Sequence, residues 1–211
     1  MGMRRRLMVY GVASAVLFAG AAWLFRPEVR DLFAYRPRVG EVVLQSLPSN
    51  RLVDAIEGIT NSHYSHCGVV DRIDGRWVVV EALGPVHATP LREWMLRGLD
   101  AGVTVCRYPF APGEAERVLA AVHAFDGRPY DMRYELDDEK IYCSELVAKG
   151  FRNGIGVQVG ALERLGDLNW RPYEATIVHY EQGPVPLDRQ MVTPVSLTRD
   201  ARLVRVFDSF C

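Results

Sequence analysis

Three residues in this sequence have side chains that could cooperate in acyl transfer: Cys143, His66 and Glu81. Cys143 begins an apolar run with helical spacing within IYCSELVAKGF (141–151). A thiol at a helix N-terminus lies at the positive end of the helix dipole, which stabilises its thiolate. Free backbone N–H groups there could also hold an oxyanion. The spacing alone favours a nucleophile and a buried, unreactive cysteine about equally.

A predicted β-hairpin brings His66 and Glu81 together. Asp74-Gly75 separates two β-rich runs, and this dipeptide is a strong signal for a two-residue turn. Gly68 then faces Glu81, and His66 becomes the diagonal neighbour of Glu81 on the same face, roughly 7–8 Å away. A carboxylate in that position orients an imidazole and stabilises its cation. The alternative is a solvated strand end, and a one-residue slip in register would separate the pair.

His63 and Cys67 flank His66 in NSHYSHC but give weaker signals. His63 lies three residues before His66, but no third ligand is obvious, so we expect no metal site. Cys67 should point to the opposite face from His66 and pack in the core.

The other histidines are weaker candidates still. His87 is expected in a loop, where it could line a cleft. His123 lies at the edge of a predicted helix, and His179 lies in the β-like run TIVHYE. We interpret both as structural or solvated residues.

The overall composition is that of a globular protein with room for one domain. The chain has 211 residues, of which 49% are hydrophobic and 24% charged. Residues 1–26 contain four arginines and no acidic residue, so the remainder carries a net charge of −5 against −1 for the whole chain. An acidic body without a basic stripe argues against nucleic acid as a partner.

The N-terminus carries a predicted export segment at residues 1–26. Arg4–Arg6 precede residues 7–25, which contain no charge and are just long enough as a helix to span a ~30 Å hydrocarbon core. The arginines would stay in the cytoplasm, so the domain would face the periplasm or exterior. Ala19-Gly20-Ala21 fits a cleavage site, so a secreted form is the alternative. Residues 27–39 would be a linker.

Four cysteines in an exported chain raise the question of disulfides. Their spacing is irregular, and a domain of this size does not need a disulfide to fold. A Cys106–Cys211 bridge is possible, and the sequence leaves it open.

The pattern of elements indicates an α+β fold with an antiparallel hairpin and segregated helices. Two segments after Gly154 are weakly patterned, with possible short helices near 161–166 and a strand at 175–180. The remaining predicted helices and strands are helices at 51–60, 90–98, 112–127 and from 143 onward, and strands at 40–45, 102–109 and 203–207.

Several motifs resemble the YiiX/YebB-like cysteine hydrolases, circularly permuted relatives of NlpC-type cell-wall peptidases in the papain-like superfamily. The resemblance spans residues 40–207 through GEVVLQ, SHYSHCGVV, VVVEAL with PLREWM, GRPYDMRYELDDEKIYCSELV and VTPVSL. Its most specific part is YCSELV preceded by G-x-P-Y-D, with the chain order histidine, acid, cysteine. The resemblance implies a permuted papain-like hydrolase domain at residues 40–211.

The same resemblance implies roles for individual residues. Cys143 would be the nucleophile, His66 the base and Glu81 the group that orients it. Tyr130 matches a tyrosine that lines the cleft in NlpC-type relatives, and we expect Tyr142 and Ser144, which flank the cysteine, to contact substrate as well.

The expected activity is therefore that of an exported, membrane-tethered thiol hydrolase that cleaves an amide or peptide bond through an acyl-enzyme. Its substrate would be a cell-wall peptide or a lipid amide, with no metal, organic cofactor, nucleic acid or obligate protein partner. An acyltransferase or lipid esterase on the same scaffold is one alternative, and a non-catalytic envelope-anchored binding module is another.

Overall fold

A two-stranded hairpin lies at the centre of the structure, a computed structural model that describes residues 34–210. It consists of β2 (His66–Ile73) and β3 (Arg76–Ala82). Asp74 and Gly75 form the turn with positive φ angles of 50° and 78°, a conformation that suits Asp-Gly. Gly68 pairs with Glu81, so the register predicted from the sequence is confirmed.

The hairpin extends into a six-stranded sheet with the order β4-β3-β2-β1-β5-β8, in which all neighbours are antiparallel. A separate pair of short strands, β6 and β7, is also antiparallel. The strands outside the hairpin are β1 (Val42–Gln45), β4 (Val86–Pro90), β5 (Val103–Arg107), β6 (Leu162–Arg164), β7 (Gln190–Val192) and β8 (Val204–Asp208).

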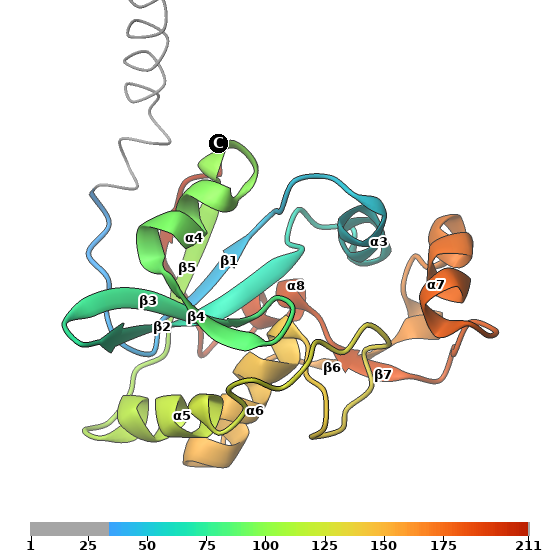
Figure 1. The fold of residues 1–211 in the computed structure, drawn as a ribbon. Coiled ribbons are helices and arrows are strands. Elements are labelled where there is room, and N and C mark those ends of the chain that lie inside the picture. The colour runs from blue at the N-terminus through green and yellow to red at the C-terminus, as the bar shows by residue number, and fades with distance from the viewer. Residues whose placement is uncertain (1–33, 211) are drawn as a thin grey trace, which may run out of the picture. The chain divides into compact units, whose positions relative to one another are not determined.

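Helices cover both faces of the central strands (Figure 1). The helix α6 packs against β2, β3 and α5, whereas α4 packs against β3 and β4 from the other side. The helices of the described residues are α3 (Arg51–Thr60), α4 (Leu91–Arg97), α5 (Glu114–His123), α6 (Cys143–Ile155), α7 (Glu174–Glu181) and α8 (Pro194–Thr198), with 3₁₀ turns at Leu99–Ala101, Leu165–Asp167 and Arg171–Tyr173.

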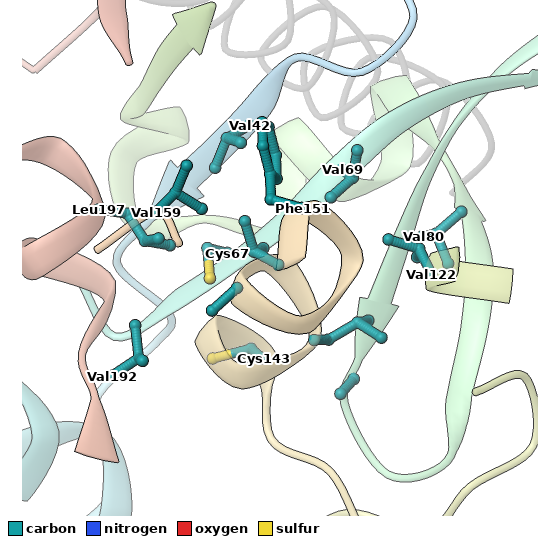
Figure 2. Packing of buried hydrophobic residues seen from close by; sticks show 14 of the residues in the cluster. Val42, Cys67, Val69, Val80, Val122, Cys143, Phe151, Val159, Val192 and Leu197 are labelled. Atoms are coloured by element: carbon teal, nitrogen blue, oxygen red, sulfur yellow. The ribbon is translucent and has the colours of Figure 1, made fainter. Parts of the chain in front are cut away.

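The main core forms where α6 lies on the sheet. Side chains alternate along β2, so Cys67 and Val69 face α6 and join one hydrophobic cluster with it (Figure 2). Leu146, Val147 and Phe151 of α6 are fully buried in that cluster. The burial of one helical face fixes the N-terminus of α6, and with it Cys143, against the start of β2.

Two glycines allow α5 and α6 to approach closely. A side chain at Gly150 would collide with Val122 of α5. A Cβ at Gly154 would lie 2.7 Å from both the Arg117 carbonyl oxygen and the Val118 Cα, which belong to backbone that cannot easily move aside. These positions therefore need glycine for packing, despite its low helix propensity.

The structure corrects several of the predicted elements. Residues 175–180 form α7 rather than a strand, and β6 with a 3₁₀ turn replaces the short helices near 161–166. The predicted helix at 112–127 is shorter, because α5 ends at His123. Pro172 lies in the turn that leads into α7, and a strand needs a partner that this segment lacks, so tertiary context overrides the β-propensity of TIVHY. The sequence analysis also missed β4, β7 and α8.

No helix within residues 34–210 is long and apolar enough to cross a membrane. The predicted anchor at residues 7–25, the rest of residues 1–26 and the first half of the linker lie outside the described residues. Cys106 is buried with a free thiol, whereas Cys211 also lies outside that part of the chain. The anchor and its cleavage therefore stay predictions.

The contact between α5 and α6 leads to a stability prediction. Gly154→Ala should lower the free energy of unfolding by about 1–3 kcal/mol, because the new methyl group overpacks against the backbone of α5. Urea denaturation followed by circular dichroism would measure the change. The neighbouring Asn153 is exposed, so Asn153→Ala should have little effect. A Gly154→Ala protein as stable as wild type would contradict this account of the interface.

Candidate active site

His66 and Glu81 form a buried hydrogen-bonded pair. His66 is the first residue of β2, and its Nε2 lies 2.5 Å from Glu81 Oε2. Each side chain is at most 2% exposed. Because the carboxylate accepts a proton at Nε2, the Nδ1 atom of the imidazole remains for the other neighbour of His66, which is Cys143.

The Glu81 carboxylate accepts hydrogen bonds from four side chains. His66 Nε2, Trp94 Nε1 at 2.8 Å and Arg97 Nη2 at 2.6 Å all bond to Oε2, while Thr89 Oγ1 bonds to Oε1 at 2.5 Å. Burial raises the pKa of Glu81, but the bonds from His66, Arg97 and Thr89 outweigh it and lower the pKa to about 2. Glu81 is therefore an anion at any ordinary pH.

Cys143 is the first residue of α6 and is only 2% exposed. A hydrogen bond with Cys67 is the largest influence on its pKa, burial opposes it, and a hydrogen bond with His66 adds to it. Together they place the pKa of Cys143 well below that of a free thiol. Burial lowers the pKa of His66, but its bonds to Cys143 and Glu81 prevail and raise it to about 9. The favoured state at neutral pH is a thiolate–imidazolium pair.

Cys67 packs in the core as predicted, but it has a second contact that the sequence analysis missed. Its side chain hydrogen-bonds with Cys143, and burial raises the pKa of Cys67 well above its usual value. Cys67 therefore stays protonated and donates to the Cys143 thiolate. Strand alternation places the side chains of Cys67 and His66 on opposite faces of the sheet. Cys143, the first residue of α6, nevertheless lies near both side chains, because α6 crosses the start of β2.

Tyr142 and Ser144 connect the start of α6 to β7. The Val192 backbone N–H donates to Tyr142 Oη at 3.0 Å, and Ser144 Oγ donates to the Val192 carbonyl at 2.8 Å. Both side chains are buried, at 0% and 1% exposure. The two residues thus hold the N-terminus of α6 in place, and their contact with substrate stays a prediction.

Tyr130 belongs to an aromatic group beside Cys143. Its hydroxyl lies 3.2 Å from that of Tyr134, and the Tyr134 ring packs 4.8 Å from the Tyr142 ring. The charge of Cys143 raises the pKa of both Tyr130 and Tyr134, after the larger effect of burial on each. Tyr134 was not predicted, although its place in GRPYDMRY, four residues after Tyr130, was a signal.

The remaining histidines lie apart from the thiol. His63 packs between the rings of Tyr64 and Phe210. His123 bonds to carboxylates of Asp71 and Asp126, in line with its predicted structural role.

His179 lies on α7 rather than in a strand, and it is exposed, in line with its predicted solvated role. The prediction for His87 needs correction, because it lies in β4 rather than in a loop. His87 pairs with Glu81 across the strands, and its Nε2 is 3.7 Å from Oε1.

The sequence and fold that carry this site are similar to those of known proteins. A family model described as "Permuted papain-like amidase enzyme, YaeF/YiiX, C92 family" matches residues 36–207. The chain belongs to this family. As a YaeF/YiiX-family protein, it is a cysteine hydrolase of the amidase or peptidase type with a mixed α/β fold. The resemblance identified from the sequence motifs is confirmed.

Two relatives of the YaeF/YiiX type show how far the likeness extends. The chain is 29% identical over 178 residues to the uncharacterized protein YiiX of Escherichia coli K12, covering 82% of this chain and 88% of that protein. A crystal structure described as metalloprotein yiiX from Escherichia coli O157:H7 superposes with a TM-score of 0.78 at 28% identity, covering 82% of this chain and 98% of the other.

The ionisation of the pair leads to a pH prediction. The Glu81 carboxylate stabilises the imidazolium, so Glu81→Gln should lower the pKa of His66 and leave the thiolate without its cation. The pKa of Cys143 then rises. In wild type, alkylation of Cys143 by iodoacetamide should persist well below pH 8. In Glu81→Gln the same alkylation rate should require a pH about 1–3 units higher than in wild type.

Mass spectrometry of the peptide that carries Cys143 would follow this alkylation. Thr89→Val is the matched control, because it removes an uncharged donor to the same carboxylate and should leave the pH dependence nearly unchanged. If a folded Glu81→Gln protein is alkylated from the same pH as wild type, the proposed thiolate–imidazolium pair is wrong.

Proposed function

We propose that this protein hydrolyses an amide bond through a triad of Cys143, His66 and Glu81. The observation that carries the proposal is the buried hydrogen bond between Glu81 and His66, with Cys143 as a neighbour close enough to influence the pKa of that imidazole. Each member has the ionisation that the reaction needs: a fixed carboxylate, a histidine able to carry the proton, and a thiolate.

In the proposed reaction, the Cys143 thiolate attacks the substrate carbonyl carbon. Backbone N–H groups of the first turn of α6, including that of Cys143, hold the oxyanion that develops. The His66 imidazolium gives its proton to the leaving amine as the C–N bond breaks, and an acyl-enzyme remains. His66, now neutral, takes a proton from water, and the resulting hydroxide releases the acid and restores the thiolate.

An apolar pocket beside this site favours a lipid amide over a cell-wall peptide as substrate. The pocket is narrow, with a volume of about 80 Å³, which suits a single apolar chain rather than a bulky ligand. Cys143 does not line it, but Tyr134 and Val192 do, and both contact the residues that flank Cys143. Most of its lining is aliphatic, with Leu52, Ala55, Ile56, Ile59, Met132, Leu165, Ile177 and Met191. Such a lining suits the acyl chain, with the carbonyl at the thiol.

The same pocket would serve an acyltransferase or a lipid esterase, which differ from an amidase in the acyl acceptor or the leaving group. A non-catalytic binding module is less well supported, because it has no need of a lowered thiol pKa. One similar structure is described as a metalloprotein. Within residues 34–210, however, no three His, Cys, Asp or Glu side chains gather in a group that could hold a metal ion.

We further propose that residues 7–25 anchor the enzyme in a membrane with the domain on the periplasmic or exterior side. The support is the uncharged segment after Arg4–Arg6, and secretion after cleavage is the alternative. A lipid amide reaching the pocket from the bilayer would be a natural substrate for an enzyme held there.

The proposed nucleophile can be tested by trapping. Cys143→Ala should abolish hydrolysis while the protein folds normally, because the sulfur that would form the acyl-enzyme is gone. Brief incubation of wild type with N-octanoyl amides, or with an octanoyl 4-nitrophenyl ester, should add an octanoyl group to the peptide that carries Cys143. Full activity in Cys143→Ala would refute the mechanism, and specific binding without turnover in wild type would support the binding module.

The pocket can be tested by filling it. Ile177→Trp should lower kcat/KM for the octanoyl ester roughly tenfold or more while sparing the acetyl ester, because excluding two methylenes costs about 1.6 kcal/mol. Val178→Trp is the matched control and should leave kcat/KM for both esters nearly unchanged. Val178 is the next residue on α7, but it is exposed and does not line the pocket. Equal losses for both esters in Ile177→Trp would argue against an acyl pocket.

A further inference from the structure

Tyr134 occupies an unusual backbone conformation in the segment between α5 and α6. Its φ is +57°, in the left-handed region that residues other than glycine adopt infrequently. Such a conformation persists where the surrounding structure holds it, and it is often found at functional sites. The question is what holds it here and what its side chain does.

Contacts on both sides of Tyr134 hold this segment. The Asp131 carboxylate accepts the backbone N–H groups of Arg133, at 2.9 Å, and of Glu135. Arg189 donates to the Arg133 carbonyl, and its guanidinium lies 3.5 Å from the Glu135 carboxylate. The backbone is therefore held immediately before and after Tyr134, which keeps this residue in its left-handed conformation.

The Tyr134 side chain connects the apolar pocket to the residues around Cys143. It lines the pocket, it packs 4.8 Å from the ring of Tyr142, and its hydroxyl meets that of Tyr130 at 3.2 Å. Tyr142 directly precedes Cys143, whose side chain is almost completely buried. Tyr134 is therefore a lining residue of the pocket that packs directly on the neighbour of Cys143, where an acyl chain with its carbonyl at the sulfur would lie close to it.

The ionisation of Tyr134 agrees with this position. Burial raises its pKa most, and the charge of Cys143 raises it further, so the hydroxyl stays protonated beside the thiolate. The ring can turn aside without leaving a charge behind, and its hydroxyl can exchange Tyr130 for another partner.

We propose that Tyr134 is a gate and a specificity-determining residue: its ring closes the inner end of the apolar pocket in front of Cys143. Small molecules reach the thiol with the ring in place, whereas a long apolar chain does so only after the ring has moved. The identity of that chain rests on the proposed function, but the gate itself can be measured without any hydrolysis.

The test compares alkylation of Cys143 by N-octylmaleimide and by iodoacetamide, read by mass spectrometry of the tryptic peptide 141–149. Tyr134→Gly should raise the ratio of the two rates at least tenfold, because glycine accepts the positive φ and removes the ring. Tyr134→Phe, which keeps the ring, should leave the ratio within twofold of wild type.

Tyr180→Ala is the matched control, since Tyr180 lines the same pocket from α7 and its removal should not change the ratio. An unchanged ratio in a folded Tyr134→Gly protein would overturn the gate. An equal rise in Tyr180→Ala would also overturn it, because general loosening would then explain the effect. Failure of the proposed amidase function would appear in a different experiment, namely as wild-type protein that forms no acyl-enzyme with the octanoyl substrates. That result would not depend on the alkylation ratio.

Discussion

The structure of the site depends on one buried anion, the carboxylate of Glu81. A charge removed from water is costly unless hydrogen bonds and opposite charges replace its hydration. Here four donors do so, and they come from β2, β4 and α4, so the packing of three elements is tied to one side chain. The guanidinium of Arg97 and the imidazole of His66 both hydrogen-bond to the Glu81 carboxylate, and both lower its pKa, so Glu81 stays ionised.

The same constraint explains why the thiol is activated so far from solvent. Cys143 and His66 are both buried, and burial alone would leave both neutral. The fixed charge of Glu81 favours the imidazolium, which favours the thiolate, and the protonated Cys67 adds a donor on the other side. The low exposure then strengthens each of these interactions, since little water screens them.

Because Cys143 is buried, a substrate can reach its sulfur only if some part of the surrounding structure moves. The core packing of α6 fixes Cys143 in place, so movement has to come from elsewhere. The segment that carries Tyr134 is irregular and held by side-chain contacts from Arg189, which are easier to release than a packed helix. In the proposed mechanism, Cys143, His66 and Glu81 stay fixed while the segment that carries Tyr134 moves to admit an apolar chain.

The sequence by itself determined the hairpin register, the His66–Glu81 pair and the helix that begins at Cys143. These follow from local rules, namely a two-residue turn, strand alternation and helical periodicity. It did not determine that α7 is a helix, that Cys67 donates to the nucleophile, or that an apolar pocket lies beside it. These features depend on contacts between segments far apart in the chain, which local spacing does not encode. Only the tertiary structure decides which surfaces meet, because burial is a property of the packed molecule rather than of any one segment.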